Sequence, residues 1–197
     1  MKQPVKLITS IVVLFASSVF AQTSTWNIDT AHSAAQFTVR HMGISNVNGN
    51  FTKTSGTVQL DEKDITKSSV EATIDVASID TRVADRDNDL KSDHFFDVAK
   101  FPTMTFKSKK ITKSGDKLSI TGDLTMHSVT REVTLESDGL TAAVADPWGN
   151  TRRGLSASTK VNRQDFGVKW GGTLAGGELV VGDEVKISLD IELIKKK

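Results

Sequence analysis

The fold class is decided by residues 185–193, which read VKISLDIEL. The apolar residues of this stretch fall at every second position, and polar or charged residues fill the positions between them. Successive side chains of a β-strand point to opposite faces of a sheet. The alternation therefore predicts an antiparallel strand with one apolar, buried face and one polar face in water.

The same period of two recurs upstream of this strand. Alternating runs occur around residues 35–40, 70–76, 104–107 and 132–136. Turn-forming sequences separate them, among them NGN at 48–50, SGD at 114–116 and DPWGN at 146–150. Several short strands with frequent turns predict an all-β domain, either a sandwich or a barrel.

One segment departs from this pattern. Residues 83–96, VADRDNDLKSDHFF, show no alternation and have Leu90 and the pair Phe95-Phe96 among their apolar anchors. The alternating runs on either side of this segment also lie too far apart for a simple hairpin. We therefore expect a short helix or an ordered segment near 83–96 that caps one end of the sheet.

Residues 1–21 have the features of a secretory signal peptide. Lys2 and Lys6 give a positive start, an apolar stretch follows, and Val19-Phe20-Ala21 provides a pattern for cleavage after Ala21. The apolar stretch is shorter than the ~20 residues that span a bilayer, although an uncleaved anchor is the alternative. We expect residues 22–197 to form one domain and the mature protein to be exported to the periplasm.

Charge and composition exclude several classes of function. The chain has 25 Lys and Arg, 24 Asp and Glu, and no cysteine. Without the signal peptide, which holds Lys2 and Lys6, the formal net charge is −1, from 23 basic and 24 acidic residues. Electrostatics therefore gives no reason to expect nucleic acid or an anionic membrane surface as a partner. The absence of cysteine excludes thiolate metal sites and thiol catalysis.

The candidate catalytic and metal-binding motifs are all incomplete. Asp85–Asp89 resembles the start of a calcium loop but lacks the glycine and the glutamate that such a loop needs. Ser114 and Lys117 have the spacing of an acyl-enzyme pair but fall in a turn. His32 and His41 bracket one strand and could meet in space, yet the histidines lack metal-site spacing. We expect a protein that is not an enzyme and takes neither a metal nor a cofactor.

The order and spacing of many short motifs resemble the YceI-like family of periplasmic lipid-binding proteins. The motifs include WNID at 26–29, FTVRH at 37–41, SIDT at 78–81, FPTMTF at 101–106, TGDLT at 121–125, DPWG at 146–149 and DFG at 165–167. Each is weak alone, but together they cover essentially the whole mature domain. The chain departs from the family at Asp89, where His is common, and at Ser128, where Gly is common. The first departure puts in doubt any head-group role for that histidine.

The resemblance implies an all-β, eight-stranded antiparallel, lipocalin-like barrel with an elongated interior cavity. It also implies a carrier for a long-chain isoprenoid of the quinone or prenyl phosphate type, or for a similar amphiphilic lipid. The alternatives are a stress-induced interaction protein with a filled barrel and, less favoured, a lipid-modifying hydrolase. We expect no nucleic acid or metal partner, and a homodimer and a membrane redox or lipid-donor partner stay open.

Two sets of residues are candidates for ligand binding. Apolar residues on the strand faces and near the capping segment are expected to line the cavity: Phe37, Val39, Phe51, Ile74, Val76, Phe95, Met104, Phe106, Leu124, Trp148, Phe166 and Trp170. Four polar residues are expected at the mouth, where a head group would lie: His32, Arg82, Arg86 and His94. The period of two does not by itself distinguish a hollow barrel from a filled one.

Overall fold

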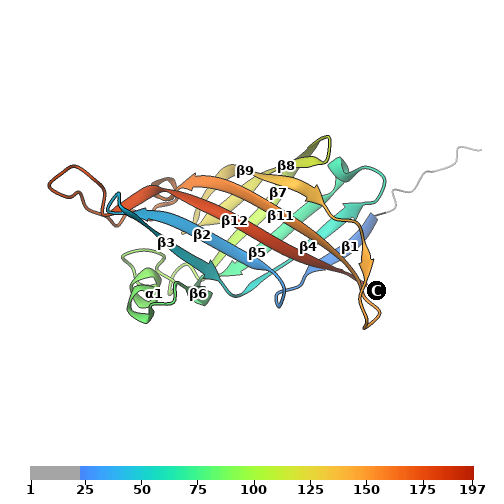
Figure 1. Cartoon of the computed structure of the whole chain (residues 1–197), viewed down its shortest axis with the longest axis horizontal. Coiled ribbons are helices and arrows are strands. Elements are labelled where there is room, and N and C mark those ends of the chain that lie inside the picture. The colour runs from blue at the N-terminus through green and yellow to red at the C-terminus, as the bar shows by residue number, and fades with distance from the viewer. Residues whose placement is uncertain (1–22) are drawn as a thin grey trace, which may run out of the picture.

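The structure, a computed structural model, describes residues 23–197, so the predicted signal peptide at 1–21 lies outside the described residues. In the described part of the chain, twelve β-segments form a single sheet (Figure 1). Among residues 23–197 no helix is long and apolar enough to cross a membrane. The β-segments are β1 (Thr23–Ile28), β2 (Ala34–His41), β3 (Ser45–Phe51), β4 (Thr54–Asp61), β5 (Ser69–Asp75), β6 (Ile79–Asp80), β7 (Thr103–Ser114), β8 (Lys117–Met126), β9 (Val129–Leu140), β10 (Val144–Ala145), β11 (Thr151–Asn162) and β12 (Val181–Lys195).

The sheet closes into a barrel because β12 pairs with β1 on one edge and with β11 on the other. The order around the barrel is β11-β9-β8-β7-β5-β4-β1-β12, after which β11 follows again. All of these neighbours run antiparallel. The predicted eight-stranded antiparallel barrel is therefore confirmed.

Three of the eight barrel strands are bent, so each appears as two segments. β2, β3 and β6 continue β1, β4 and β5 beyond short breaks at 29–33, 52–53 and the 3-10 turn η2 (Val76–Ser78). The extra pairings β12–β2, β2–β3 and β3–β6 prolong the wall of the barrel. This extension lies at the end of the barrel where the helix is found (Figure 1).

The segment without alternation forms the predicted short helix, α1 (Ala84–Lys91), which confirms an ordered cap near 83–96. The Asp87 carboxylate accepts hydrogen bonds from the backbone N–H of Thr81, at 2.8 Å, and from its hydroxyl, at 2.6 Å. These bonds tie the helix to the end of β6. The chain that follows α1 buries Phe95, which is 7% exposed. The capping segment therefore covers the interior of the barrel beside β6.

The hairpin between β8 and β9 explains one departure from the family pattern. Met126 pairs with Val129, so the loop consists of His127 and Ser128 alone. Both residues have positive φ, 52° and 60°, as a tight two-residue hairpin turn requires. Glycine adopts this conformation without the steric cost that a side chain brings.

We expect Ser128→Gly to raise the free energy of unfolding by about 1 kcal/mol, because it removes a Cβ from left-handed backbone. The urea midpoint measures the change. Ser119→Gly, at an extended position of β8, is the matched control and should lower stability instead. Equal destabilisation by both substitutions would contradict the account of this turn.

Candidate functional site

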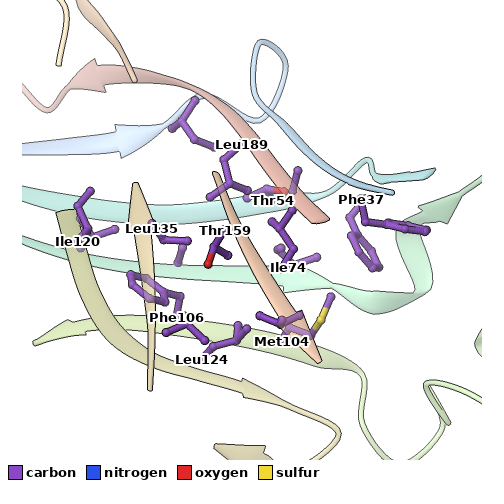
Figure 2. A pocket seen from close by; sticks show the side chains of 18 of the residues that line it. Phe37, Thr54, Ile74, Met104, Phe106, Ile120, Leu124, Leu135, Thr159 and Leu189 are labelled. Atoms are coloured by element: carbon purple, nitrogen blue, oxygen red, sulfur yellow. The ribbon is translucent and has the colours of Figure 1, made fainter. Parts of the chain in front are cut away.

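The barrel encloses an apolar cavity of about 250 Å³. Figure 2 shows labelled side chains from several strands gathered around it, including Phe37, Ile74, Phe106, Leu124 and Leu189. One water molecule needs only ~10–15 Å³ of such space, so this volume is far larger than a packing defect. An enclosed space with apolar walls offers few hydrogen bonds to water and is suited to a hydrocarbon.

Eight of the twelve predicted lining residues lie on the wall of this cavity: Phe37, Val39, Phe51, Ile74, Phe95, Met104, Phe106 and Leu124. They come from β2, β3, β5, β7, β8 and the segment after α1. For the seven that lie on strands, alternation in sequence places the side chains on the inner face of the barrel. That these residues contact a ligand stays a prediction.

The other four predicted lining residues lie elsewhere, which corrects their placement. Val76 and Phe166 are 1% and 2% exposed and pack into the core from the 3-10 turns η2 and η3 (Arg163–Phe166), where strand alternation does not apply. Trp170 lies outside the wall and packs against Phe95 in a tilted arrangement, with ring centroids 5.0 Å apart. Trp148 is 77% exposed, because the turn between β10 and β11 carries it into solvent.

Many aliphatic residues of the wall were not among the candidates, although the sequence contained a signal for them. Every apolar residue of the stretch 185–193 lines the cavity, and so do several residues of β8, β9 and β11. The alternation that identified the strand also indicates these side chains as inward. The additional lining residues include Ile120, Leu135, Leu155, Val185, Ile187, Leu189, Ile191 and Leu193.

Arg163 is the only charged residue among the described residues that line the cavity. It is 5% exposed. Its guanidinium has five N–H donors, and all five are used within the protein. They reach the carbonyls of Gly182, Val168, Trp170 and Val181 and the carboxylate of Asp183, at 2.6–3.1 Å. Arg163 therefore presents no unused donor to a ligand in the cavity.

At one end of the barrel, which we call the closed end, a buried tryptophan packs behind the cavity wall. Trp26 on β1 is 1% exposed and packs with Leu60 and Leu193. The side chains of Arg153 and Lys195 lie over its ring, 5.5 and 5.7 Å from the centroid. Cations above the face of an indole are attracted by its ring electrons. The closed end is thus held by apolar packing and by charge.

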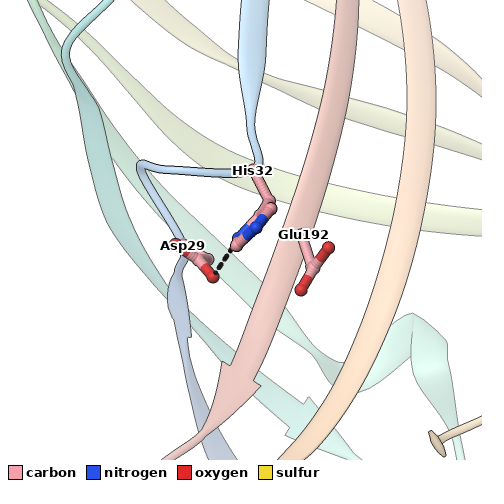
Figure 3. Close-up of side chains that lie close together, drawn as sticks. All are labelled: Asp29, His32 and Glu192. Carbon is pink, nitrogen blue, oxygen red and sulfur yellow. Dashed lines mark hydrogen bonds and ion pairs between the residues drawn. The ribbon is translucent and has the colours of Figure 1, made fainter. Parts of the chain in front are cut away.

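A second cluster, around Arg152, links strands near the closed end. Arg152 donates to Asp29 and to Asp146, each at 2.6 Å, and also to Glu192. His32 pairs with the same oxygen of Asp29 at 2.8 Å (Figure 3). The ligand atoms of Asp29, His32 and Glu192 lie within 4.8 Å of one another, a spacing that a metal ion could bridge. Arg152 already supplies these carboxylates with a cation, so we assign the cluster a structural role.

The cluster lowers the pKa of two of its carboxyl groups. Hydrogen bonds from His32 and Arg152 hold the pKa of Asp29 below its usual value of 3.8. Burial alone would raise the pKa of Asp146, but hydrogen bonds from Arg152, Asn150 and Trp148 hold it well below 3.8. A carboxyl with a lowered pKa stabilises the fold above its unfolded-state pKa, and this contribution is lost as the pH falls through the folded-state pKa.

We therefore expect the urea midpoint of the wild-type protein to fall as the pH drops below about 4. Arg152→Leu should lower stability at pH 7 and reduce the difference between the urea midpoints at neutral and acid pH. Urea unfolding at pH 7 and pH 3 measures both effects. Lys160→Leu breaks an exposed ion pair to Glu184 and is the control, with little effect at either pH. An unchanged acid dependence in Arg152→Leu would refute the assignment.

Of the four predicted mouth residues, Arg82, Arg86 and His94 lie in or beside the capping segment, and His32 lies apart from them. His32 belongs to the Arg152 cluster. Arg86 donates from Nε to the hydroxyl of Thr81 and from Nη2 to its carbonyl, so it braces the capping segment. Arg82 and His94 are exposed, and His94 pairs with Asp89 at 2.9 Å. Asp89 is thus paired with a histidine five residues later. Head-group contacts by any of the four stay a prediction.

Sequence and structure comparisons identify relatives of this chain. The model of the YceI-like domain matches residues 26–193. Protein YceI of Escherichia coli O157:H7 is 42% identical over 138 residues, which cover 70% of this chain and 72% of that protein. The crystal structure of BcnA from Burkholderia cenocepacia matches with a TM-score of 0.72 at 26% identity, covering 84% of this chain and 98% of that chain. A polyisoprenoid binding domain from Saccharophagus degradans matches with a TM-score of 0.63 at 13% identity, over 87% and 98% of the two chains, and shows a shared fold alone. The chain belongs to the YceI-like domain family.

Proposed function

We propose that this protein is a periplasmic carrier that holds the apolar chain of a long-chain isoprenoid, or of a similar amphiphilic lipid, inside its barrel. The observation that carries this proposal is the apolar cavity of about 250 Å³ enclosed by the eight strands. A filled barrel, as in an interaction protein, would leave no such space. The size of the cavity favours the carrier over that alternative.

Burial of hydrocarbon supplies the affinity in this proposal. Removal of apolar surface from water contributes about 25 cal/mol per Å², so an isoprenoid chain gains several kcal/mol without any specific polar contact. Water inside the cavity has few partners and is displaced at little cost. Affinity then depends on the length of chain that the cavity accommodates.

The head group of the ligand lies outside the cavity in this proposal. Arg163, the charged lining residue, has all of its donors engaged within the protein. A buried phosphate without free donors would carry a large desolvation cost. A quinone ring or a prenyl phosphate would therefore remain at the end covered by α1, with only its tail enclosed.

Two further observations support a carrier in the periplasm. The N-terminal sequence has the pattern of an export signal. The Saccharophagus degradans domain of the same fold is described as polyisoprenoid binding. A lipid that moves between two membranes must cross water, and an apolar cavity would shield it there.

We propose a non-catalytic role for this chain. A hydrolase would need a base beside a nucleophile in the cavity. His32 and His94 instead pair with Asp29 and Asp89, and neither histidine lines the cavity. Turnover of a prenyl pyrophosphate by the purified protein would overturn this part of the proposal.

Native mass spectrometry tests the carrier function. The mature protein is purified from the periplasm without detergent, and intact and solvent-extracted samples are compared. We expect one isoprenoid or similar lipid per protein, or uptake of an added long-chain quinone by empty protein. Protein that is empty and takes up neither a quinone nor a prenyl lipid would contradict the proposal.

A further inference from the structure

We call the end of the barrel opposite Trp26 the capped end. The capping segment lies at this end, and the loop at residues 169–180 projects from it (Figure 1). Val168 and Val181, the residues on either side of this loop, line the cavity. Arg163 holds both sides of the loop, because it donates to Val168 and Trp170 on one side and to Val181 and Gly182 on the other.

Three large apolar side chains are exposed in the loop at residues 169–180 and in the turn beside it. Ile44, in the turn between β2 and β3, is 78% exposed, and Leu179 and Trp170 in the loop are 41% and 40% exposed. The N–H of Met42 donates to the carbonyl of Val180, at 3.0 Å, and the N–H of Val180 donates to Gly172, at 2.9 Å. These bonds place the turn beside the loop. The three side chains therefore share one end of the molecule, which we call the apolar tip.

The apolar tip continues into the cavity wall. The Trp170 ring packs against Phe95 in a tilted arrangement with centroids 5.0 Å apart, and Phe95 lines the cavity. A hydrocarbon chain that passes between the loop and the capping segment would meet apolar surface along this route. At the closed end, Trp26 and the Arg152 cluster offer no comparable path.

We propose that the apolar tip inserts into the surface of a phospholipid bilayer and that the carried lipid enters and leaves the cavity there. This inference rests on the proposed carrier function, because the cargo itself is dissolved in a bilayer. Exposed aliphatic side chains and a tryptophan at neighbouring loops suit the membrane–water interface, where tryptophan is enriched.

Charge and shape favour a bilayer over a protein partner at this surface. The charged residues beside the tip are Lys169 and Glu178, next to it in sequence, and Arg40, which donates to the carbonyl of Gly43. Their signs are mixed, so the tip has no strong preference for anionic lipid. Three side chains on two projecting loops also offer little of the ~800 Å² per partner that a stable protein interface buries. Docking is therefore expected on zwitterionic lipid and to depend little on salt.

Quenching of Trp170 by brominated phosphatidylcholine vesicles tests the docking directly. The experiment uses the mature Trp148→Phe protein, in which Trp26 is buried and Trp170 is the exposed tryptophan. We expect quenching by vesicles of lipid brominated in the acyl chains. Ile44→Asp and Leu179→Asp in the same background should weaken vesicle binding about tenfold or more, since each loses an inserted apolar group. Val144→Asp, at an exposed apolar site on β10, should leave quenching unchanged.

Transfer kinetics separate this inference from the carrier function. A long-chain isoprenoid quinone is supplied either in phosphatidylcholine vesicles or from ethanol, and protein-bound quinone is measured. We expect Ile44→Asp and Leu179→Asp to slow uptake from vesicles about tenfold but to load normally from ethanol. Wild-type uptake rates from vesicles in both variants, or no quenching of Trp170, would overturn the docking proposal. Self-association in place of vesicle binding would also overturn it, whereas failure of the wild type to load from ethanol would refute the carrier function.

Discussion

Phe106→Asp is expected to bind a long-chain isoprenoid quinone at least about a hundredfold more weakly than the wild type. The Phe106 ring lies on the wall of the cavity, where β7 pairs with Ala72 of β5 and Leu124 of β8. Gly122 leaves room for this ring, since a Cβ at that position would lie 2.6 Å from Cζ of Phe106. A carboxylate at the same position would retain water and place it where the hydrocarbon chain is expected.

The substitution also removes buried apolar surface, so we expect the free energy of unfolding to fall by about 3–5 kcal/mol. Circular dichroism and urea unfolding establish whether the variant is folded before binding is measured. Phe106→Leu, which keeps an apolar wall, should bind the quinone with a change of less than about tenfold. Thr112→Asp adds the same charge on an exposed residue of the same strand and should bind normally.

Normal quinone uptake by folded Phe106→Asp would contradict the assignment of the cavity as the binding site. If that variant does not fold, Phe106→Gln provides the test, because it introduces polarity without a full charge. Weak binding by Phe106→Gln together with normal binding by Thr112→Asp would place the effect in the interior of the barrel.

The barrel could be predicted from the sequence largely because its strands alternate between an apolar face toward the interior and a polar face toward water. The alternation at 185–193 identified a strand, and its apolar residues proved to lie on the cavity wall. Seven of the twelve candidates for the wall are aromatic, and Leu135 and Leu189, which also line it, are not among them. The face of the strand on which a residue lies, and not the size of its side chain, determines whether it lines the cavity.

Positions outside regular strands could not be predicted in this way. Phe166 lies in a 3-10 turn and packs into the core beside the cavity, and the turn that carries Trp148 points into solvent. The pairing of Asp29 with Arg152 joins residues 123 positions apart. Such contacts form only when the barrel closes, and local sequence patterns do not show which distant residues this closure brings together. His32 therefore could not be separated from the other mouth candidates by sequence alone.

The buried position of Arg163 could not be predicted from the sequence either, because a single arginine after a strand forms no distinctive pattern. In the structure it is 5% exposed and joins the two sides of the 169–180 loop. Its guanidinium is paired with one carboxylate, Asp183, at 3.0 Å. Burial lowers the pKa of Arg163, although arginine keeps its charge throughout the physiological range.

We expect Arg163→Met to lower the free energy of unfolding by about 3 kcal/mol or more. Methionine fills part of the volume but leaves the carbonyls of Val168, Trp170, Val181 and Gly182 without their donor. Unpaired buried polar groups cost about 1–3 kcal/mol each, and partial exposure to water after relaxation keeps the total below their sum. Urea unfolding measures the loss.

The same variant should release the loop locally, and this separates its role from general destabilisation. Amide hydrogen exchange in residues 169–180 should become at least about tenfold faster in Arg163→Met, while the Trp26 region at the closed end changes little. Arg86→Met removes an arginine that also bonds to a backbone carbonyl and serves as the matched control. It should loosen the capping segment and leave residues 169–180 protected. Uniformly faster exchange in Arg163→Met would indicate that the whole barrel is destabilised and that Arg163 does not stabilise the loop locally. A localised effect would show that Arg163 holds the two sides of this loop together at the capped end.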